Sequence, residues 1–130
     1  MKLGSTLYIN NTAAAVVFYQ NAFDLTLGYH VKNPDGTMMH AELCRDGREI
    51  FAVSESRNDP LVKLMLASKL KESRPTMCLG ITFDNAAEVK TAYDVLAKEG
   101  TVLFPLGSLP WSDCCAEVVD KYGVCWYLTI

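Results

Sequence analysis

The sequence has 130 residues, half of them hydrophobic, and a formal net charge of −3 at pH 7. These values are typical of one globular domain and exclude the strongly basic surface of a nucleic-acid-binding protein. The chain has no apolar run of the roughly 18 residues that a membrane-spanning helix needs, so we expect no membrane partner.

The first half of the chain predicts a strand, a helix and then three strands. Thr12 is suited to cap the helix, and the sequences Asn33-Pro34-Asp35-Gly36 and Asp46-Gly47 are typical of turns. The strands show the alternation of apolar and polar side chains that a half-buried sheet requires. The predicted elements are a strand at 3–10, a helix at 13–23, and strands at 27–32, 37–44 and 49–54.

Residues 55–75 separate the two halves. Asp59-Pro60 is a fair helix start, and Leu61, Leu64 and Met65 follow at helical spacing. We expect a short helix at 61–71. It is either a linker whose apolar stripe packs on the sheet, or a lid or dimer contact.

The second half predicts the same order of elements again. Asn85 is suited to cap its helix, and Glu99-Gly100 ends that helix. The predicted elements are a strand at 77–83, a helix at 86–98, a strand at 101–104, a loop at 105–110, and strands at 113–119 and 124–130.

The two halves therefore form a duplicated module. The same interval separates Asn11 from Tyr19 and Asn85 from Tyr93. A half this short cannot bury both faces of its own sheet, so we expect the two halves to pack together. The fold class is α+β, in which two βαβββ modules form a curved, mostly antiparallel sheet cup with the helices outside and a ligand site in the concave seam. The expected organisation is one domain over 1–130, with module one at 1–54, a linker at 55–75 and module two at 76–130.

Alternation along the strands assigns side chains to two faces of the sheet. One set is apolar and predicts the core. The other mixes aromatic and polar groups, which is the usual composition of a small-molecule pocket. The expected core residues include Leu3, Leu7, Ile9, Met39, Ala41, Leu43, Met77, Leu79, Ile81 and Phe83. The expected pocket residues include Tyr8, Met38, His40, Glu42, Phe51, Cys78 and Tyr127, with Phe51 aligned to Tyr127 by the repeat.

His40 and Glu42 are the best candidates for catalysis. They lie two apart on one strand, where burial of both would be costly unless they are paired or solvated. They suit a general base with an orienting or acidic partner. The alternative is a structural histidine and a glutamate paired with a lysine or arginine.

The five cysteines are odd in number and include no Cys-x-x-Cys motif. We expect buried thiols rather than a disulfide framework. The N-terminal residues also lack the apolar core of a signal peptide, so a reducing cytoplasm is the expected location. Cys114 and Cys115 are adjacent and point to opposite faces of a strand, and we expect Cys114 to face the pocket. Trp111 is expected at the rim of the pocket or at an interface.

Four segments of the chain carry a family resemblance: Phe18-Tyr19-Gln20-Asn21-Ala22-Phe23, Met39-His40-Ala41-Glu42-Leu43, Trp111-Ser112 and Asp120-Lys121-Tyr122-Gly123-Val124-Cys125-Trp126. Together with the duplicated modules, they resemble the vicinal oxygen chelate superfamily, which includes glyoxalase I, bleomycin-resistance proteins and extradiol dioxygenases, and within it the PhnB-like branch. Metal enzymes of that superfamily take ligands from four strand positions, and the resemblance assigns Gly4, Phe51, Cys78 and Tyr127 to them. These residues make a poor site for a hard divalent ion, so no cofactor is expected.

Three functions remain open at this point. The first is a protein of the bleomycin-resistance type that binds a small aromatic or planar molecule without the usual metal site. The second is a lyase or isomerase that uses a divalent ion held by His40 and Glu42. The third is a dimeric scaffold or regulatory protein without catalysis. The resemblance also implies a homodimer.

Overall fold

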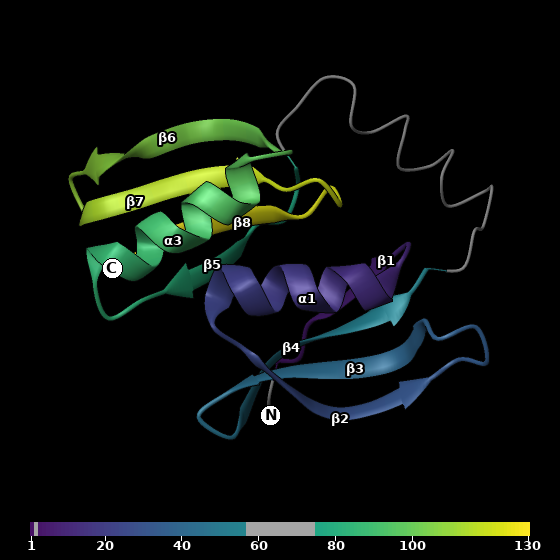
Figure 1. The fold of residues 1–130 in the computed structure, drawn as a ribbon. Helices are drawn as coiled ribbons and strands as arrows, with labels where there is room; N and C mark the ends of the chain where they lie inside the picture. Colours follow the sequence, from purple (N-terminus) through teal and green to yellow (C-terminus); the bar gives the residue numbers. More distant parts are fainter. Residues whose placement is uncertain (2, 57–74) are drawn as a thin grey trace.

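The computed structural model describes residues 1, 3–56 and 75–130, and it confirms the duplicated βαβββ order (Figure 1). The predicted helix at 61–71 lies outside the described residues. Module one contains β1 (Thr6–Ile9), α1 (Thr12–Phe23), β2 (Thr26–Lys32), β3 (Met38–Arg45) and β4 (Arg48–Glu55). Module two contains β5 (Leu79–Thr82), α3 (Ala86–Ala97), β6 (Thr101–Leu109), β7 (Ser112–Val119) and β8 (Cys125–Thr129).

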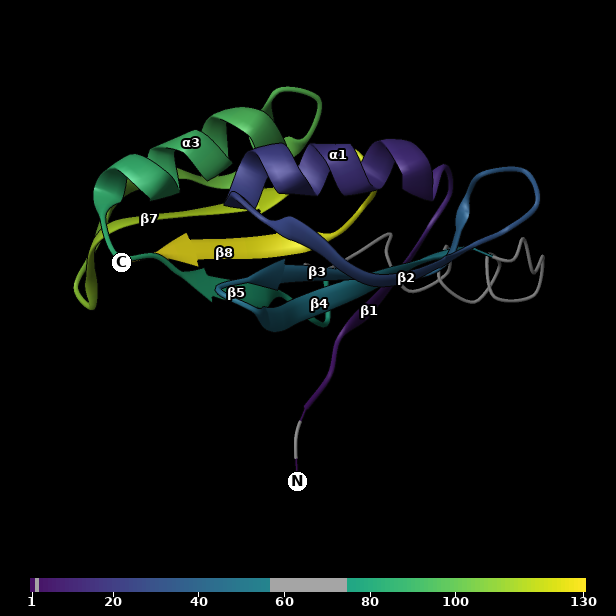
Figure 2. The same cartoon turned by 60° about the horizontal axis from the view of Figure 1, so that its bottom comes forward.

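The described strands form two four-stranded sheets, with the orders β1-β4-β3-β2 and β5-β8-β7-β6. In each sheet the first strand of the module pairs in parallel with the last, and the other pairs are antiparallel. The α+β class and the mostly antiparallel pairing are therefore confirmed. Helices α1 and α3 contact each other and lie on one side of the strands (Figure 2). The other side of both sheets has no described helix over it, and we call it the open face.

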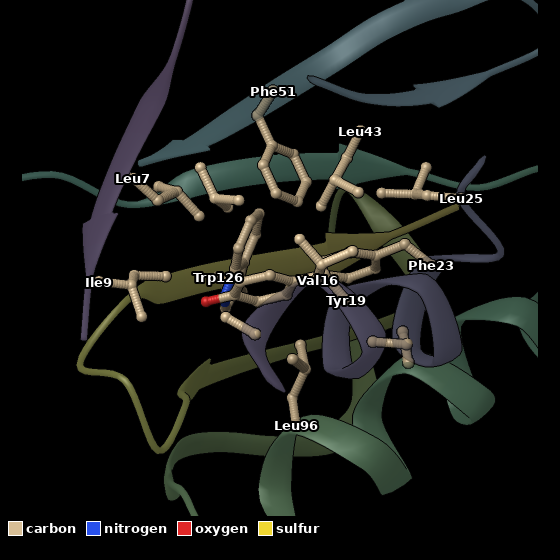
Figure 3. Close-up of a cluster of buried hydrophobic side chains, with 14 of the residues drawn as sticks. Leu7, Ile9, Val16, Tyr19, Phe23, Leu25, Leu43, Phe51, Leu96 and Trp126 are labelled. Atoms are coloured by element: carbon tan, nitrogen blue, oxygen red, sulfur yellow. The ribbon is translucent and has the colours of Figure 1, made fainter. Parts of the chain in front are cut away.

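One hydrophobic core lies between the helices and the sheets, and both modules contribute to it (Figure 3). Tyr19 of α1 is at its centre. The Tyr19 ring makes edge-to-face contacts with Phe51 of β4 and Trp126 of β8, at centroid distances of 5.4 and 5.6 Å. Such pairs add about 0.5–1.5 kcal/mol to the free energy gained from burial alone. The modules are therefore joined by side chains packed between them as well as by the linker.

Asp120 is a buried carboxylate in this core, only 4% exposed. Among the described residues, the Tyr19 hydroxyl and the Trp126 indole N–H donate to Oδ2 at 2.7 and 2.8 Å. The backbone N–H groups of Tyr122 and Val124 donate to Oδ1 at 2.9 and 3.1 Å. Burial and the negative charge of Asp120 raise the pKa of Tyr19, so this phenol stays protonated and remains a donor. Asp120 thus bonds module one to the last turn of module two.

Glu55 and Thr12 connect the start of α1 to two strands. The Glu55 carboxylate accepts hydrogen bonds from the backbone N–H groups of Asn11 and Thr12 and from the Thr12 hydroxyl, at 2.8, 2.9 and 2.6 Å. The Thr12 Oγ1 in turn accepts from the backbone N–H of Met38 at 2.7 Å. These contacts satisfy N–H groups that the first turn of a helix leaves without intrahelical partners. Burial raises the pKa of Glu55, but the hydrogen bonds from Thr12 and Asn11 outweigh it and hold the pKa below its usual value.

Some sequence predictions about the strands are wrong. Leu3 and Met77, predicted core residues, are exposed because they precede the paired segments that begin at Thr6 and Leu79. The predicted loop at 105–110 is mostly part of β6. This strand lies at the edge of its sheet and pairs irregularly with β7, and a proline such as Pro105 is tolerated there.

The predicted positions of Met38 and Met39 are also reversed. Met38 is buried in the core and Met39 is exposed. The pairing of β2 with β3 shifts register between Val31 and Lys32, opposite this end of β3. The shift interrupts the alternation that correctly assigns Ala41 and Leu43 to the core.

The variant Asp120→Asn should lower the free energy of unfolding by about 2–3 kcal/mol. An amide cannot accept on both terminal atoms, so donors now paired with the carboxylate would lose a partner. Urea unfolding followed by circular dichroism measures this loss. The exposed Asp113→Asn variant on β7 is the control, and a change within about 0.5 kcal/mol for both would contradict the anchoring role of Asp120.

The variant Glu55→Gln should destabilise the fold at neutral pH by about 0.5–2 kcal/mol, the usual range for loss of a helix cap. The folded-state pKa of Glu55 is depressed. Its contribution is therefore fully present above the unfolded pKa of about 4.3 and disappears as the pH falls through the folded pKa. Unfolding curves of wild type and variant, measured from pH 7 to pH 3, should converge at the acidic end. The exposed Glu49→Gln variant controls for a change in charge on the same strand.

Candidate functional site

The open face brings together the polar and aromatic side chains that alternate with the core residues. Tyr8 of β1 is 73% exposed there, while its neighbours Leu7 and Ile9 are buried. Directly paired residues on neighbouring strands point to the same side of a sheet. The pairing of Glu42 with Ala52 identifies the open face in module one, and the pairing of Gly80 with Tyr127 identifies it in module two. The open face comprises Thr6, Tyr8, His40, Glu42, Cys44, Ala52, Ser54, Gly80, Thr82, Cys115, Glu117, Cys125, Tyr127 and Thr129.

Trp111 and Tyr127 form a hydrogen-bonded aromatic pair on module two. Trp111 lies in the turn between β6 and β7 and is 72% exposed. Its indole N–H donates to the Tyr127 hydroxyl at 2.9 Å. Gly80 lies opposite Tyr127 on β5, and a Cβ placed there would meet no atom within 4 Å. The pair therefore stands beside open space on the sheet surface.

His40 and Glu42 share the open face of module one. Their nearest atoms, Nε2 and Oε1, are 3.8 Å apart, which is too long for a hydrogen bond but within range of an ion pair when the imidazole is protonated. The His40 ring also lies 6.3 Å from the ring of Tyr29. The two side chains are therefore close enough for the ion pair that the catalytic hypothesis proposes. They are not joined by the direct hydrogen bond that would orient the imidazole for proton transfer.

Phe51 is not on the open face, contrary to the sequence prediction. It is 2% exposed and contacts Tyr19 and Trp126 in the core. The structure pairs Thr6 with Ala52 in module one and Gly80 with Tyr127 in module two. Ala52, not Phe51, is therefore the counterpart of Tyr127.

The error in placing Phe51 comes from the hairpins. The interval that aligns Phe51 with Tyr127 also matches Gly47 with Gly123, but these glycines occupy different turns. Asp46 and Gly47 both have positive φ, at 52° and 73°, as in a two-residue hairpin loop. Gly123 ends a longer turn in which its N–H donates to the carbonyl of Asp120.

Cys114 is also placed differently from the prediction. Its side chain packs against the core cluster. Cys115 pairs with Thr129, which puts Cys115 on the open-face side of β7, although it is fully buried. The two thiols point to opposite faces as predicted, but Cys115, not Cys114, lies on the open-face side.

The four positions that the resemblance assigns to metal ligands do not fit a hard divalent ion. Gly4 has no side chain, and Phe51 is in the core. Its structural replacement, Ala52, offers no ligand atom either. The Tyr127 hydroxyl already accepts the Trp111 indole N–H. The residues at these positions therefore give no basis for a reaction step that uses a metal held there.

A different group of donor atoms converges on module two. One ligand atom each from Cys78, Glu117 and Cys125 lies within 4.8 Å of the others, and this is the one such group of three or more among the described residues. Cys78 is an expected pocket residue, but nothing in the sequence connects it with Cys125 and Glu117. The group becomes visible only once the structure places β8 between β5 and β7.

On the helix side, a pocket of about 260 Å³ lies between the end of α1 and the start of α3, lined in part by Phe23, Asp24 and Thr91. Arg45 at the end of β3 and Glu88 of α3 also line it and form an ion pair. The Arg45 guanidinium holds the pKa of Glu88 below its usual value, despite the opposing effect of burial. Because this charged pair joins the two modules, we assign it to the packing of the fold.

Among the described residues, no helix is both long and apolar enough to cross a membrane.

Comparisons with known proteins agree with this architecture. A PhnB protein from Bacillus cereus, described as a putative 3-demethylubiquinone-9 3-methyltransferase, superposes with a TM-score of 0.75 at 30% identity, covering 99% of this chain and 98% of that one. Protein PA1353 from Pseudomonas aeruginosa has the same fold, with a TM-score of 0.72 at 23% identity over 99% of this chain and 96% of that one.

In sequence, the uncharacterized protein Rv0887c of Mycobacterium tuberculosis (strain ATCC 25618 / H37Rv) is 31% identical over 129 residues, which cover 97% of this chain and 72% of the relative. The family model described as Glyoxalase/Bleomycin resistance protein/Dioxygenase superfamily matches residues 3–126. The resemblance inferred from the duplicated modules is thereby confirmed, and the chain belongs to the Glyoxalase/Bleomycin resistance protein/Dioxygenase superfamily.

Proposed function

We propose that the chain binds a small planar or aromatic molecule on its open face, without the metal site usual in the family's metal enzymes. The observation that carries this proposal is the exposed Trp111–Tyr127 pair. A large indole in water loses the hydrophobic stabilisation that burial would give it. Here its orientation is fixed by a hydrogen bond of 2.9 Å rather than by packing in the core.

The surroundings of this pair suit a ligand that stacks on it. Gly80 pairs with Tyr127 and has open space where a side chain would stand, so it leaves room beside the aromatic rings. The face combines these aromatic rings with polar side chains that can orient a ligand, as small-molecule sites do. Thr129 and Ser112 are hydrogen bonded to each other at 2.7 Å, and their hydroxyls supply orienting contacts at the edge.

The proposed site is completed by a second copy of the chain. A small-molecule site buries most of the surface of its ligand, whereas the open face of one chain carries widely exposed aromatic groups such as Tyr8 and Trp111. A homodimer in which two open faces approach would cover both. The odd number of cysteines and the lack of a disulfide-type pattern support a cytoplasmic location.

His40 and Glu42 support a second candidate function, an enzyme of the lyase or isomerase type. Their side chains approach to 3.8 Å on one face of β3, so both can contact the same bound substrate. This candidate differs from the first in its essential residues, which belong to module one rather than module two.

The variant Trp111→Ala should weaken binding of a planar aromatic ligand by about 10- to 100-fold, because it removes the stacking surface. Hits are first found by thermal shift with a panel of such compounds, since a ligand at 100 times its Kd adds about 2.7 kcal/mol. Isothermal titration then gives Kd for wild type, Trp111→Ala and Tyr127→Phe, with a smaller loss for the last. The exposed Val17→Ala variant on α1 is the control.

The same measurements separate the alternatives. Binding that survives Trp111→Ala but is lost in His40→Ala would favour the enzyme. A panel without any hit would contradict ligand binding and favour a scaffold.

The variant Tyr8→Asp should raise the dissociation constant of the dimer at least tenfold, because it puts a charge at the proposed interface. Sedimentation velocity over a range of protein concentrations measures this constant. Val17→Asp, on the helix side, should leave it unchanged. A wild-type chain that stays monomeric at every concentration would overturn the proposed dimer.

A further inference from the structure

We propose that Cys78, Glu117 and Cys125 form a binding site for a thiophilic divalent cation, zinc. The inference stands on the side chains of module two alone. It does not depend on the small-molecule site proposed above. It also differs from the family's ligand positions, with which it shares only Cys78.

The strand pairing brings the three side chains together. The parallel pairing of Leu79 with Trp126 sets Cys78 beside Cys125, the residues that precede them. On the other side of β8, the antiparallel pairing of Glu117 with Tyr127 sets Glu117 diagonal to Cys125 on the same face. Three neighbouring strand segments, from residues far apart in sequence, thus direct their donor atoms to one point of the open face.

The distances suit a tetrahedral ion. Zinc–sulfur bonds of about 2.3 Å and zinc–oxygen bonds of about 2.0–2.2 Å require neighbouring ligand atoms to lie about 3.5–3.8 Å apart. Cys125 Sγ and Glu117 Oε1 are 3.7 Å apart, and all three donor atoms are within 4.8 Å of one another. Small side-chain rotations bring such atoms to coordinating distances without movement of the sheet.

The chemistry of the donors selects the metal. Two thiolates and one carboxylate favour zinc over magnesium or calcium, which prefer oxygen ligands alone. Cys125 is 4% exposed, so its sulfur is a ligand at the buried end of the site. Cys78 is exposed, so the ion can reach the site from solvent on that side. Three protein ligands leave a fourth position for water or a substrate atom.

The neighbours of the site connect it to the aromatic pair. Tyr127 lies between its strand partners Gly80 and Glu117, so its ring rises from the sheet beside the proposed ion. Gly80 contributes no side chain to obstruct the space above. An ion held here would face the same open space as Trp111.

Cobalt(II) titration of the reduced, full-length protein tests the site, because thiolate ligands give cobalt an intense charge-transfer absorption in the near ultraviolet. We expect this band to saturate at one cobalt per chain and to disappear when zinc is added. Cys78→Ser and Glu117→Gln should each weaken binding at least tenfold. Cys44→Ser, a cysteine substitution on the open face of module one, should leave the affinity unchanged.

Circular dichroism of each variant confirms that it is folded before titration. Absence of a thiolate band in wild type, or an unchanged affinity in both Cys78→Ser and Glu117→Gln, would overturn the proposed site. Trp111→Ala should still bind cobalt normally. Failure of the metal site and failure of the small-molecule site are therefore distinguishable, because different variants report on each.

Discussion

The buried carboxylate of Asp120 is the interaction on which the rest of the structure depends. A charge in an apolar core is costly unless hydrogen bonds compensate it. The compensation here comes from both modules, with the Tyr19 hydroxyl on one side and the Trp126 indole and a turn backbone on the other. Tyr19 can donate only if α1 of module one packs across module two. The charge therefore favours one arrangement of the modules over other apolar packings of similar area.

This arrangement determines which surface is available for function. Because α1 and α3 lie together over the shared core, the helix sides of both sheets are used for packing (Figure 2). The chemistry-bearing side chains are then presented together on the open face. Module one contributes His40 and Glu42 there, and module two contributes the aromatic pair and the Cys78–Glu117–Cys125 group. The repeated fold thus carries two different sets of functional groups.

Most of the architecture could be predicted from the sequence, because it depends on local signals. The cap at Asn85 and the alternation of Leu7 and Ile9 with Tyr8 report directly on the fold. At α1 the cap is Asn11, one residue before the predicted Thr12, which is the first residue of the helix. The errors arose where register depends on pairing partners that the sequence does not reveal. Phe51 was aligned through hairpins of different geometry, and Met38 was assigned without the register shift between β2 and β3.

The site was harder to predict than the fold for the same reason. Trp111 and Tyr127 were each identified, but their hydrogen bond depends on how β6 continues through Pro105 to the turn. The relation of Glu117 to Cys78 requires knowing that β8 lies between β5 and β7. Strands that are neighbours in the sheet but distant along the chain leave no periodic pattern in the sequence from which their pairing could be predicted.

The alternation from Trp126 to Thr129 along β8 has a consequence for how such a protein changes over evolutionary time. Trp126 and Leu128 are fully or almost fully buried, while Tyr127 and Thr129, the residues that follow each of them, are partly exposed on the open face. Substitution at the outward positions alters the chemistry presented to a ligand and leaves the packed residues in place. Proteins that share this strand can therefore exchange one binding chemistry for another by single substitutions, and each intermediate variant keeps the packed core that stabilises the fold.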